Sequence, residues 1–101
     1  MRIMLPSMAL VLMTAAPVMA EDGKRIFNRK GCTSCHGVDA KTTVSGAYPK
    51  LAGQHKDYIV GQLQAFQSAA RSSNRSKEMI PFARSLSAEQ VEAVASYISS
   101  L

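Results

Sequence analysis

The segment Cys32-Thr33-Ser34-Cys35-His36 constrains the fold of this chain more than any other part of the sequence. Two thiols three positions apart lie on one side of a helical turn, because residues i and i+3 are neighbours on a helix. A histidine follows directly, and a neutral imidazole nitrogen is a good ligand for iron. The order C-x-x-C-H is the sequence mark of c-type haem. We therefore predict one haem c attached through thioethers to Cys32 and Cys35, with His36 as the proximal ligand of its iron.

Other uses of a C-x-x-C pair fit this sequence less well. A redox dithiol of the thioredoxin kind is expected within a βαβ pattern, and no strand-like alternation of apolar and polar residues is visible. A closed zinc site needs four ligands, and the two cysteines and two histidines of the chain are not spaced as in a zinc finger. A structural disulfide is the third alternative to haem attachment.

The first twenty residues have the composition of a cleavable signal peptide. Met1-Arg2 is a short basic start, residues 3–16 are mostly apolar, and residues 18–20 end on a small side chain as cleavage sites do. A membrane anchor is the alternative, but the apolar stretch is short and is interrupted by Pro, Ser and Thr. We therefore expect a signal peptide over residues 1–20 and one domain over residues 21–101, exported to the periplasm. No later apolar run is long enough to cross a bilayer.

The expected domain reads as helices joined by loops. Apolar residues recur at helical spacing in the middle and last stretches, the first stretch carries Ile26 and Phe27, and the segments between them are polar or contain glycine and proline. Helices are expected at residues 22–30, where Gly31 ends the helix, at residues 55–71, and from residue 87 onward. We expect residues 42–53 to form an irregular loop and residues 71–78 an exposed polar loop.

The last helix has the clearest start signal. Ser87 and Gln90 have the spacing of a capping box, and Leu86 with Val91 has the spacing of a hydrophobic staple. The apolar stripe of this helix consists of Val91, Val94, Ala95 and Ile98. A domain of this size buries only a modest core, so we expect the haem to lie at its centre and to stabilise it.

Met79 is the candidate for the second axial ligand of the iron. It is the only methionine of residues 21–101, because the other five lie in the expected signal peptide. Pro81 disfavours helical backbone at the residue before it, so we expect Met79 in a loop, where its thioether can bind iron. Met79 filling a gap in the core is one alternative. His55 is the rival ligand, although a histidine at the start of a helix is more often solvated.

Several segments together resemble a known family, the small class I cytochromes c. The likeness covers essentially all of residues 21–101 and is closest to the bacterial cytochrome c-553 type and to a single domain of cytochrome c4. The segment Tyr48-Pro49-Lys50-Leu51-Ala52-Gly53-Gln54 is far more restrictive than the haem motif alone. The remaining matching positions are residues 23–27, 31–37, 58, 62–63, 66, 79, 86–87 and 97–98.

The resemblance implies an all-α fold, with helices and loops wrapped around one covalently bound haem. It implies that Gly23 and Phe27 on the first helix pack across Tyr97 on the last. It also implies that the carbonyl of Pro49 accepts a hydrogen bond from the second imidazole nitrogen of His36, which would orient the ring. The distal iron ligand of that family corresponds to Met79, which is also the candidate reached above from the methionine content of residues 21–101.

With both axial positions filled by side chains, the iron has no open site for a small molecule. The sequence also shows no nucleophile–base pair or other catalytic constellation. We therefore expect a carrier of single electrons between respiratory or other redox partners rather than an enzyme. One alternative is a cytochrome subunit of a larger periplasmic oxidoreductase, for example in sulfur oxidation. Another is a haem sensor or haem enzyme in which Met79 leaves the iron.

The charge of the chain says little about its partners. Twelve Lys and Arg against seven Asp and Glu give a formal net charge of +5, and loss of Arg2 with the signal peptide would leave +4. Two haem propionates would halve that charge, so nucleic acid is not an expected partner. Three basic residues precede Met79 and are expected near the exposed haem edge, where redox proteins would dock. They are Arg71, Arg75 and Lys77.

Overall fold

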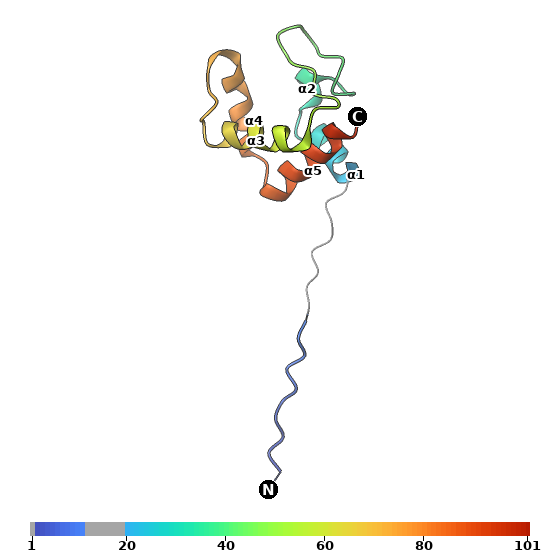
Figure 1. Ribbon diagram of the computed structural model, residues 1–101, viewed down its shortest axis with the longest axis vertical. Helices are drawn as coiled ribbons and strands as arrows, with labels where there is room; N and C mark the ends of the chain where they lie inside the picture. Colours follow the sequence, from blue (N-terminus) through green and yellow to red (C-terminus); the bar gives the residue numbers. More distant parts are fainter. Residues whose placement is uncertain (1, 12–19) are drawn as a thin grey trace.

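The structure is a computed structural model that describes residues 2–11 and 20–101. Within these ranges it contains helices and no strand (Figure 1), which confirms the predicted all-α fold. The helices are α1 (Ala20–Arg29), α2 (Thr33–His36), α3 (Lys56–Gln67), the 3-10 helix η1 (Asn74–Glu78), α4 (Met79–Arg84) and α5 (Ala88–Ser99).

The expected signal peptide is described only in part. Residues 2–11 are exposed and have no regular secondary structure, whereas residues 1 and 12–19, which include most of the expected cleavage region, lie outside the described residues. No helix in the described ranges is long and apolar enough to span a membrane. A signal peptide over residues 1–20 therefore stays a prediction.

The first and last helices of the domain meet at a glycine. A Cβ atom on Gly23 of α1 would lie 2.6 Å from Cβ of Tyr97 and 2.7 Å from the carbonyl carbon of Ala93 on α5, so only glycine allows this approach. One turn later the ring of Phe27 meets that of Tyr97 edge to face, with centroids 5.7 Å apart. This is the packing that the family resemblance implies.

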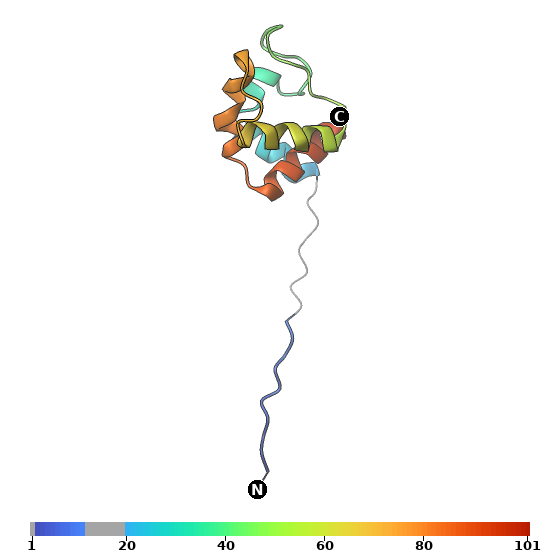
Figure 2. The ribbon, with the colours of Figure 1, turned by 60° about the vertical axis from the view of Figure 1, so that its left-hand side comes forward.

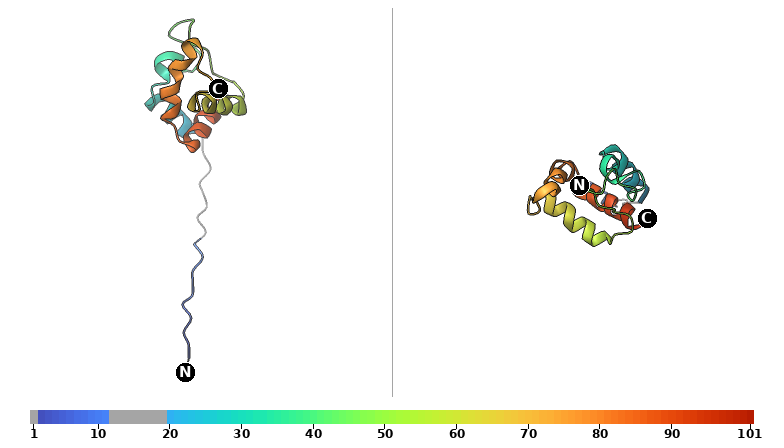
Figure 3. Two further views of the ribbon diagram at one scale, coloured as in Figure 1. Left: turned by 90° about the vertical axis from the view of Figure 1, so that its left-hand side faces the viewer. Right: turned by 90° about the horizontal axis from the view of Figure 1, so that it is seen from above.

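Helix α5 is the centre of the domain. Figure 3, in the view from above, places it between α1 and α3, and its predicted apolar stripe is buried. The predicted capping box is present, because Ser87 Oγ accepts from the Gln90 N–H at 3.1 Å and Gln90 Oε1 accepts from the Ser87 N–H at 2.9 Å. The start of this helix is thus determined by local chemistry that the sequence already contains.

Helix α3 ends earlier than the sequence predicts. It stops at Gln67, four residues short of Arg71, and Ala69 then adopts a positive φ of 59°. The Ser68 hydroxyl donates to the Ala65 carbonyl and accepts from the Ala70 N–H, and such local bonds compete with the helical pattern. The early end leaves the segment after α3 free to turn toward η1 and α4, which stand at the C-terminal end of α3 and cross it steeply in Figure 2.

The prediction of a loop at Met79 is wrong. Residues 71–78 are mostly exposed, as expected, but Asn74–Glu78 forms η1, and Met79 is the first residue of α4. Pro81 is the third residue of α4. The N–H groups of a first helical turn have no acceptor within the helix, so the missing N–H of a proline costs nothing there. Pro81 therefore does not keep Met79 out of a helix.

Candidate haem-binding site

A cavity of about 480 Å³ opens between two parts of the domain. One part consists of α2 and the loop that follows it, and the other of α3, η1 and α4, as Figure 1 shows. The floor includes Phe27 of α1 and Val94 and Ile98 of α5. Most of the lining is apolar, and the volume is within the range of sites for small molecules and cofactors.

The haem motif lies on the α2 side of this cavity. Gly31, with a φ of 81°, ends the turn after α1, and the chain then enters α2, where the His36 N–H donates to the Cys32 carbonyl at 3.0 Å. Cys32, Cys35 and His36 all line the cavity. Cys32 is half-buried, and burial raises the pKa of its thiol. His36 is 6% exposed. The structure thus brings the three residues of the motif to one wall.

The imidazole of His36 is oriented by the loop that follows α2. Its Nδ1 lies 2.8 Å from the carbonyl oxygen of Pro49. A hydrogen bond from Nδ1–H to this carbonyl leaves Nε2 as the nitrogen with a free lone pair, which is the form that binds a metal. The contact joins residues thirteen positions apart, so it depends on the path of the intervening loop.

That loop is held in three places. The N–H groups of Leu51 and Ala52 both donate to the carbonyl of Ala40, at 2.8 and 3.0 Å, and the Gly53 N–H donates to Ile98 at 2.9 Å. The carboxylate of Asp39 accepts from the N–H groups of Lys41 and Thr42 and from the Thr42 hydroxyl. These hydrogen bonds lower the pKa of Asp39 to about 2. They close the loop that delivers Pro49 to His36.

Met79 and His55 are placed very differently. Met79 is partly buried, packs against the core and lines the cavity from the α4 side. His55 is exposed at the start of α3 and does not belong to the cavity lining. The structure therefore brings Met79, and not its rival, to the same cavity as His36.

Polar groups gather at one end of the cavity. Arg71 donates to Gln62 Oε1 at 2.7 Å, and its guanidinium lies 4.8 Å from the centroid of the Phe66 ring. Arg75 lies over the Tyr48 ring at 5.4 Å and pairs with Glu78 at 3.4 Å. Both arginines line the cavity, whereas the third predicted basic residue, Lys77, is exposed and does not.

Tyr48 and Glu78 were not singled out as site residues from the sequence. The Glu78 carboxylate raises the pKa of the Tyr48 phenol, and the Cys35 thiol acts in the same direction. The sequence indicates them only through their position, because Tyr48 directly precedes the predicted site residue Pro49 and Glu78 directly precedes Met79. Their contact with Arg75 depends on the tertiary fold.

The residues present fit a haem. Its porphyrin is flat and apolar and carries two carboxylates at one edge, and the cavity has a mostly apolar lining that also includes the cations Arg71 and Arg75. Two thiols for covalent attachment, an oriented imidazole and a soft thioether sulfur all line the same space. This donor set suits haem iron.

Comparison with known proteins identifies the family of this chain. The family model described as "Cytochrome c" matches residues 20–101. The chain is 32% identical to cytochrome c4 of Azotobacter vinelandii over 91 residues, which cover 89% of this chain and 43% of that protein. It is 34% identical to the thiosulfate dehydrogenase electron acceptor of Stutzerimonas stutzeri over 97 residues, covering 89% of this chain and 44% of that protein.

A solved structure gives the same result. Reduced cytochrome c4 from Pseudomonas stutzeri superimposes with a TM-score of 0.70 at 33% identity, covering 86% of this chain and 50% of that one. The chain thus spans about half the length of the relatives it matches. It belongs to the cytochrome c family, and its cofactor is one covalently attached haem c with its iron.

Proposed function

We propose that this protein carries single electrons, with haem attached to Cys32 and Cys35 and with His36 and Met79 as the axial ligands of its iron. The observation that carries the proposal is that His36 of α2 and Met79 of α4 line the same cavity. Each axial position then has a side chain, and none is open to a small molecule. When bound, the haem supplies reversible one-electron chemistry at iron.

The protein residues determine the properties of that iron. A hydrogen bond to the Pro49 carbonyl would hold the imidazole of His36 in the metal-binding tautomer and fix the orientation of its ring. The soft sulfur of Met79 favours ferrous iron, so it raises the reduction potential relative to a second histidine. The apolar lining also disfavours the extra positive charge of ferric iron. These effects suit a carrier, and we infer that the protein is not itself an enzyme.

A second candidate function rests on one relative. The similar protein of Stutzerimonas stutzeri is named a thiosulfate dehydrogenase electron acceptor. The protein described here would then take electrons from an enzyme that oxidises an inorganic sulfur compound, either as a free carrier or as a bound subunit. Purification from the host separates these cases, because a bound subunit elutes together with its enzyme.

We also propose that the protein is exported to the periplasm and that residues 1–20 are removed. The basic start, the apolar stretch and the small residue at position 20 support this proposal. Mass spectrometry of the protein from its host tests it. The expected mass is that of residues 21–101 plus one haem, and a chain that retains residue 1 would contradict it.

A basic rim next to the cavity is the proposed docking region for redox partners. Arg71 and Arg75 are engaged by Gln62, Phe66, Tyr48 and Glu78, so their charges are partly committed within the domain. Lys77 is exposed between them and the α4 helix. We therefore assign steering of an acidic partner mainly to Lys77, since exposed charges of this kind increase association rates more than affinity.

Substitution of Met79 tests the proposed ligands. Met79→Ala leaves the thioethers and His36 intact, so the haem should stay covalently bound while the weak far-red sulfur-to-iron band of the ferric protein disappears. The reduction potential should fall, and cyanide or imidazole should bind readily. His55→Ala is the matched control and should change none of these properties. If the two variants exchange their spectra, His55 is the ligand and the proposal is wrong.

A further inference from the structure

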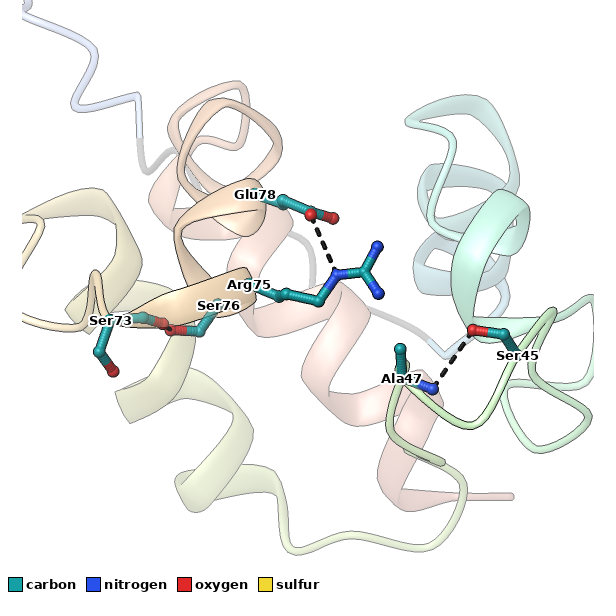
Figure 4. Close-up of polar contacts among 6 residues, drawn as sticks. All are labelled: Ser45, Ala47, Ser73, Arg75, Ser76 and Glu78. Carbon is teal, nitrogen blue, oxygen red and sulfur yellow. Dashed lines mark hydrogen bonds and ion pairs between the residues drawn. The ribbon is translucent and has the colours of Figure 1, made fainter.

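Arg75 makes a contact across the mouth of the cavity. Its guanidinium lies over the ring of Tyr48, with 5.4 Å between Cζ and the ring centroid, and its Nε lies 3.4 Å from Oε1 of Glu78. Figure 4 shows the side chain reaching from η1 toward the loop that contains Ser45 and Ala47. The contact therefore joins segments that are far apart in the sequence.

One end of this contact lies next to a proposed iron ligand, and the other lies next to the residue whose carbonyl orients the second ligand. Tyr48 directly precedes Pro49, whose carbonyl is hydrogen-bonded to His36. Glu78 directly precedes Met79. The three side chains Tyr48, Arg75 and Glu78 thus connect the His36 wall to the Met79 wall without passing through the haem. We call these three residues the clasp.

The local backbone aims Arg75 at the loop. The Ser76 hydroxyl donates to the Ser73 carbonyl, and the Ser76 N–H donates to the same carbonyl at 3.2 Å, which forms the turn of η1. On the facing side, the Ala47 N–H donates to Ser45 Oγ at 3.2 Å. Figure 4 shows these two bonded turns facing each other, with Arg75 between them. The clasp therefore joins two locally ordered turns.

A second polar contact ties α4 to the segment that precedes the haem motif. Among the described residues, a hydrogen bond from Lys30 Nζ to the Ser85 carbonyl, at 3.0 Å, ties the end of α1 to the far end of α4. Met79 is at the opposite end of α4, next to Arg75.

Helix α4 is also held to α3, because Gln67 Nε2 donates to the carbonyls of Ala83 and Leu86, at 2.9 and 3.1 Å, and Arg84 Nε donates to the carbonyl of Gln67 at 3.0 Å. These hydrogen bonds lie toward the C-terminal end of α4. At the other end, packing against the core, the haem and the clasp together oppose movement of Met79 away from α2.

We propose that Arg75 is a positioning residue that keeps Met79 on the haem iron by holding η1 against Tyr48. The proposal rests on the ligands assigned above. Removal of Arg75 would increase the fraction of molecules in which Met79 has left the iron, and an added ligand would bind that fraction. Apparent affinity for the added ligand rises in proportion to the open fraction.

The expected effect is moderate because the clasp is exposed. The Arg75 and Glu78 side chains are 63% and 48% exposed. The Arg75–Glu78 ion pair lies within η1, so only the contact of Arg75 with Tyr48 joins the two walls. An exposed cation–π contact corresponds to about a two- to fivefold change in an equilibrium. Complete loss of Met79 from the iron would have a much larger effect.

Titration of the ferric holoprotein with imidazole tests the clasp, with the far-red band and the Soret band as readouts. Arg75→Gln and Tyr48→Leu should each increase the apparent imidazole affinity about two- to fivefold, and the double variant should add little to either. Arg75→Lys retains the positive charge, so its imidazole affinity should lie between that of the wild type and that of Arg75→Gln. Lys77→Gln removes the same charge from the same segment and should leave the imidazole affinity unchanged.

Three outcomes would overturn the proposal. The first is that Arg75→Gln matches Lys77→Gln. The second is that the effects of Arg75→Gln and Tyr48→Leu add fully. The third is that the amides of residues 74–78 exchange hydrogen at the wild-type rate in both variants. Failure of the ligand assignment is recognised separately. The wild-type protein would then lack the far-red band, whereas faster exchange in both clasp variants would still support the contact between Arg75 and Tyr48.

Discussion

Substitution of Gly23 by alanine is expected to destabilise the folded protein by about 3 kcal/mol. The added Cβ would lie 2.6 Å from Cβ of Tyr97 and 2.7 Å from the carbonyl carbon of Ala93, and closer still to its oxygen. Neither the backbone of α5 nor a Cβ atom can rotate away. The axes of α1 and α5 must therefore separate by about 1 Å to reach normal van der Waals distance.

The magnitude combines three terms. Overpacking against backbone corresponds to the upper end of the usual range, about 3 kcal/mol. Separation of the helices weakens the edge-to-face pair of Phe27 and Tyr97, at a cost of about 1 kcal/mol. Alanine has a higher helix propensity than glycine, which offsets about 1 kcal/mol of this loss. The net loss is about 3 kcal/mol, or roughly 12–24 °C in Tm for a domain of this size.

Guanidinium and thermal unfolding of the holoprotein, followed by far-ultraviolet circular dichroism, measure this loss. Gly61→Ala is the matched control, because Gly61 lies within α3 and a Cβ there would meet nothing within 4 Å. The control should stabilise the protein by about 0.5–1 kcal/mol through helix propensity alone. If Gly23→Ala behaves like Gly61→Ala, the close approach of α1 and α5 does not exist.

Two further substitutions test the loop and the rim. Asp39→Asn removes a carboxylate whose pKa is lowered to about 2 by the hydrogen bonds from Thr42 and Lys41. Because the folded state favours the ionised carboxylate, these hydrogen bonds stabilise the fold above pH 4, and that stabilisation is lost as the pH falls toward 2. The variant should therefore be less stable at pH 7 and should lose less stability between pH 4 and 2, which urea unfolding at several pH values would measure. Lys77→Gln should slow second-order electron transfer to an acidic partner at low ionic strength and leave the reduction potential unchanged. Equal rates for variant and wild type at low salt would show that Lys77 does not steer docking.

Local chemistry made much of this protein predictable from its sequence. The haem motif is contiguous, so Cys32, Cys35 and His36 share a helical turn in any fold that forms it. The capping box of Ser87 and Gln90 acts over one turn, and it starts α5 at the predicted residue. Met79 could be named as a candidate ligand by elimination, because the mature chain is expected to contain no other methionine.

The tertiary structure decided what depends on contacts between distant segments. Pro81 disfavours helix at the preceding residue as a general rule, but in the first turn of α4 its missing N–H costs no hydrogen bond, so the helix tolerates it and Met79 begins a helix. The contact of Arg75 with Tyr48 joins two segments that are distant in the sequence, and the local sequence of neither segment indicates it. Short-range patterns report hydrogen bonds and side-chain spacing within one element. Contacts across the cavity depend on how several elements pack together, and only the folded chain shows them.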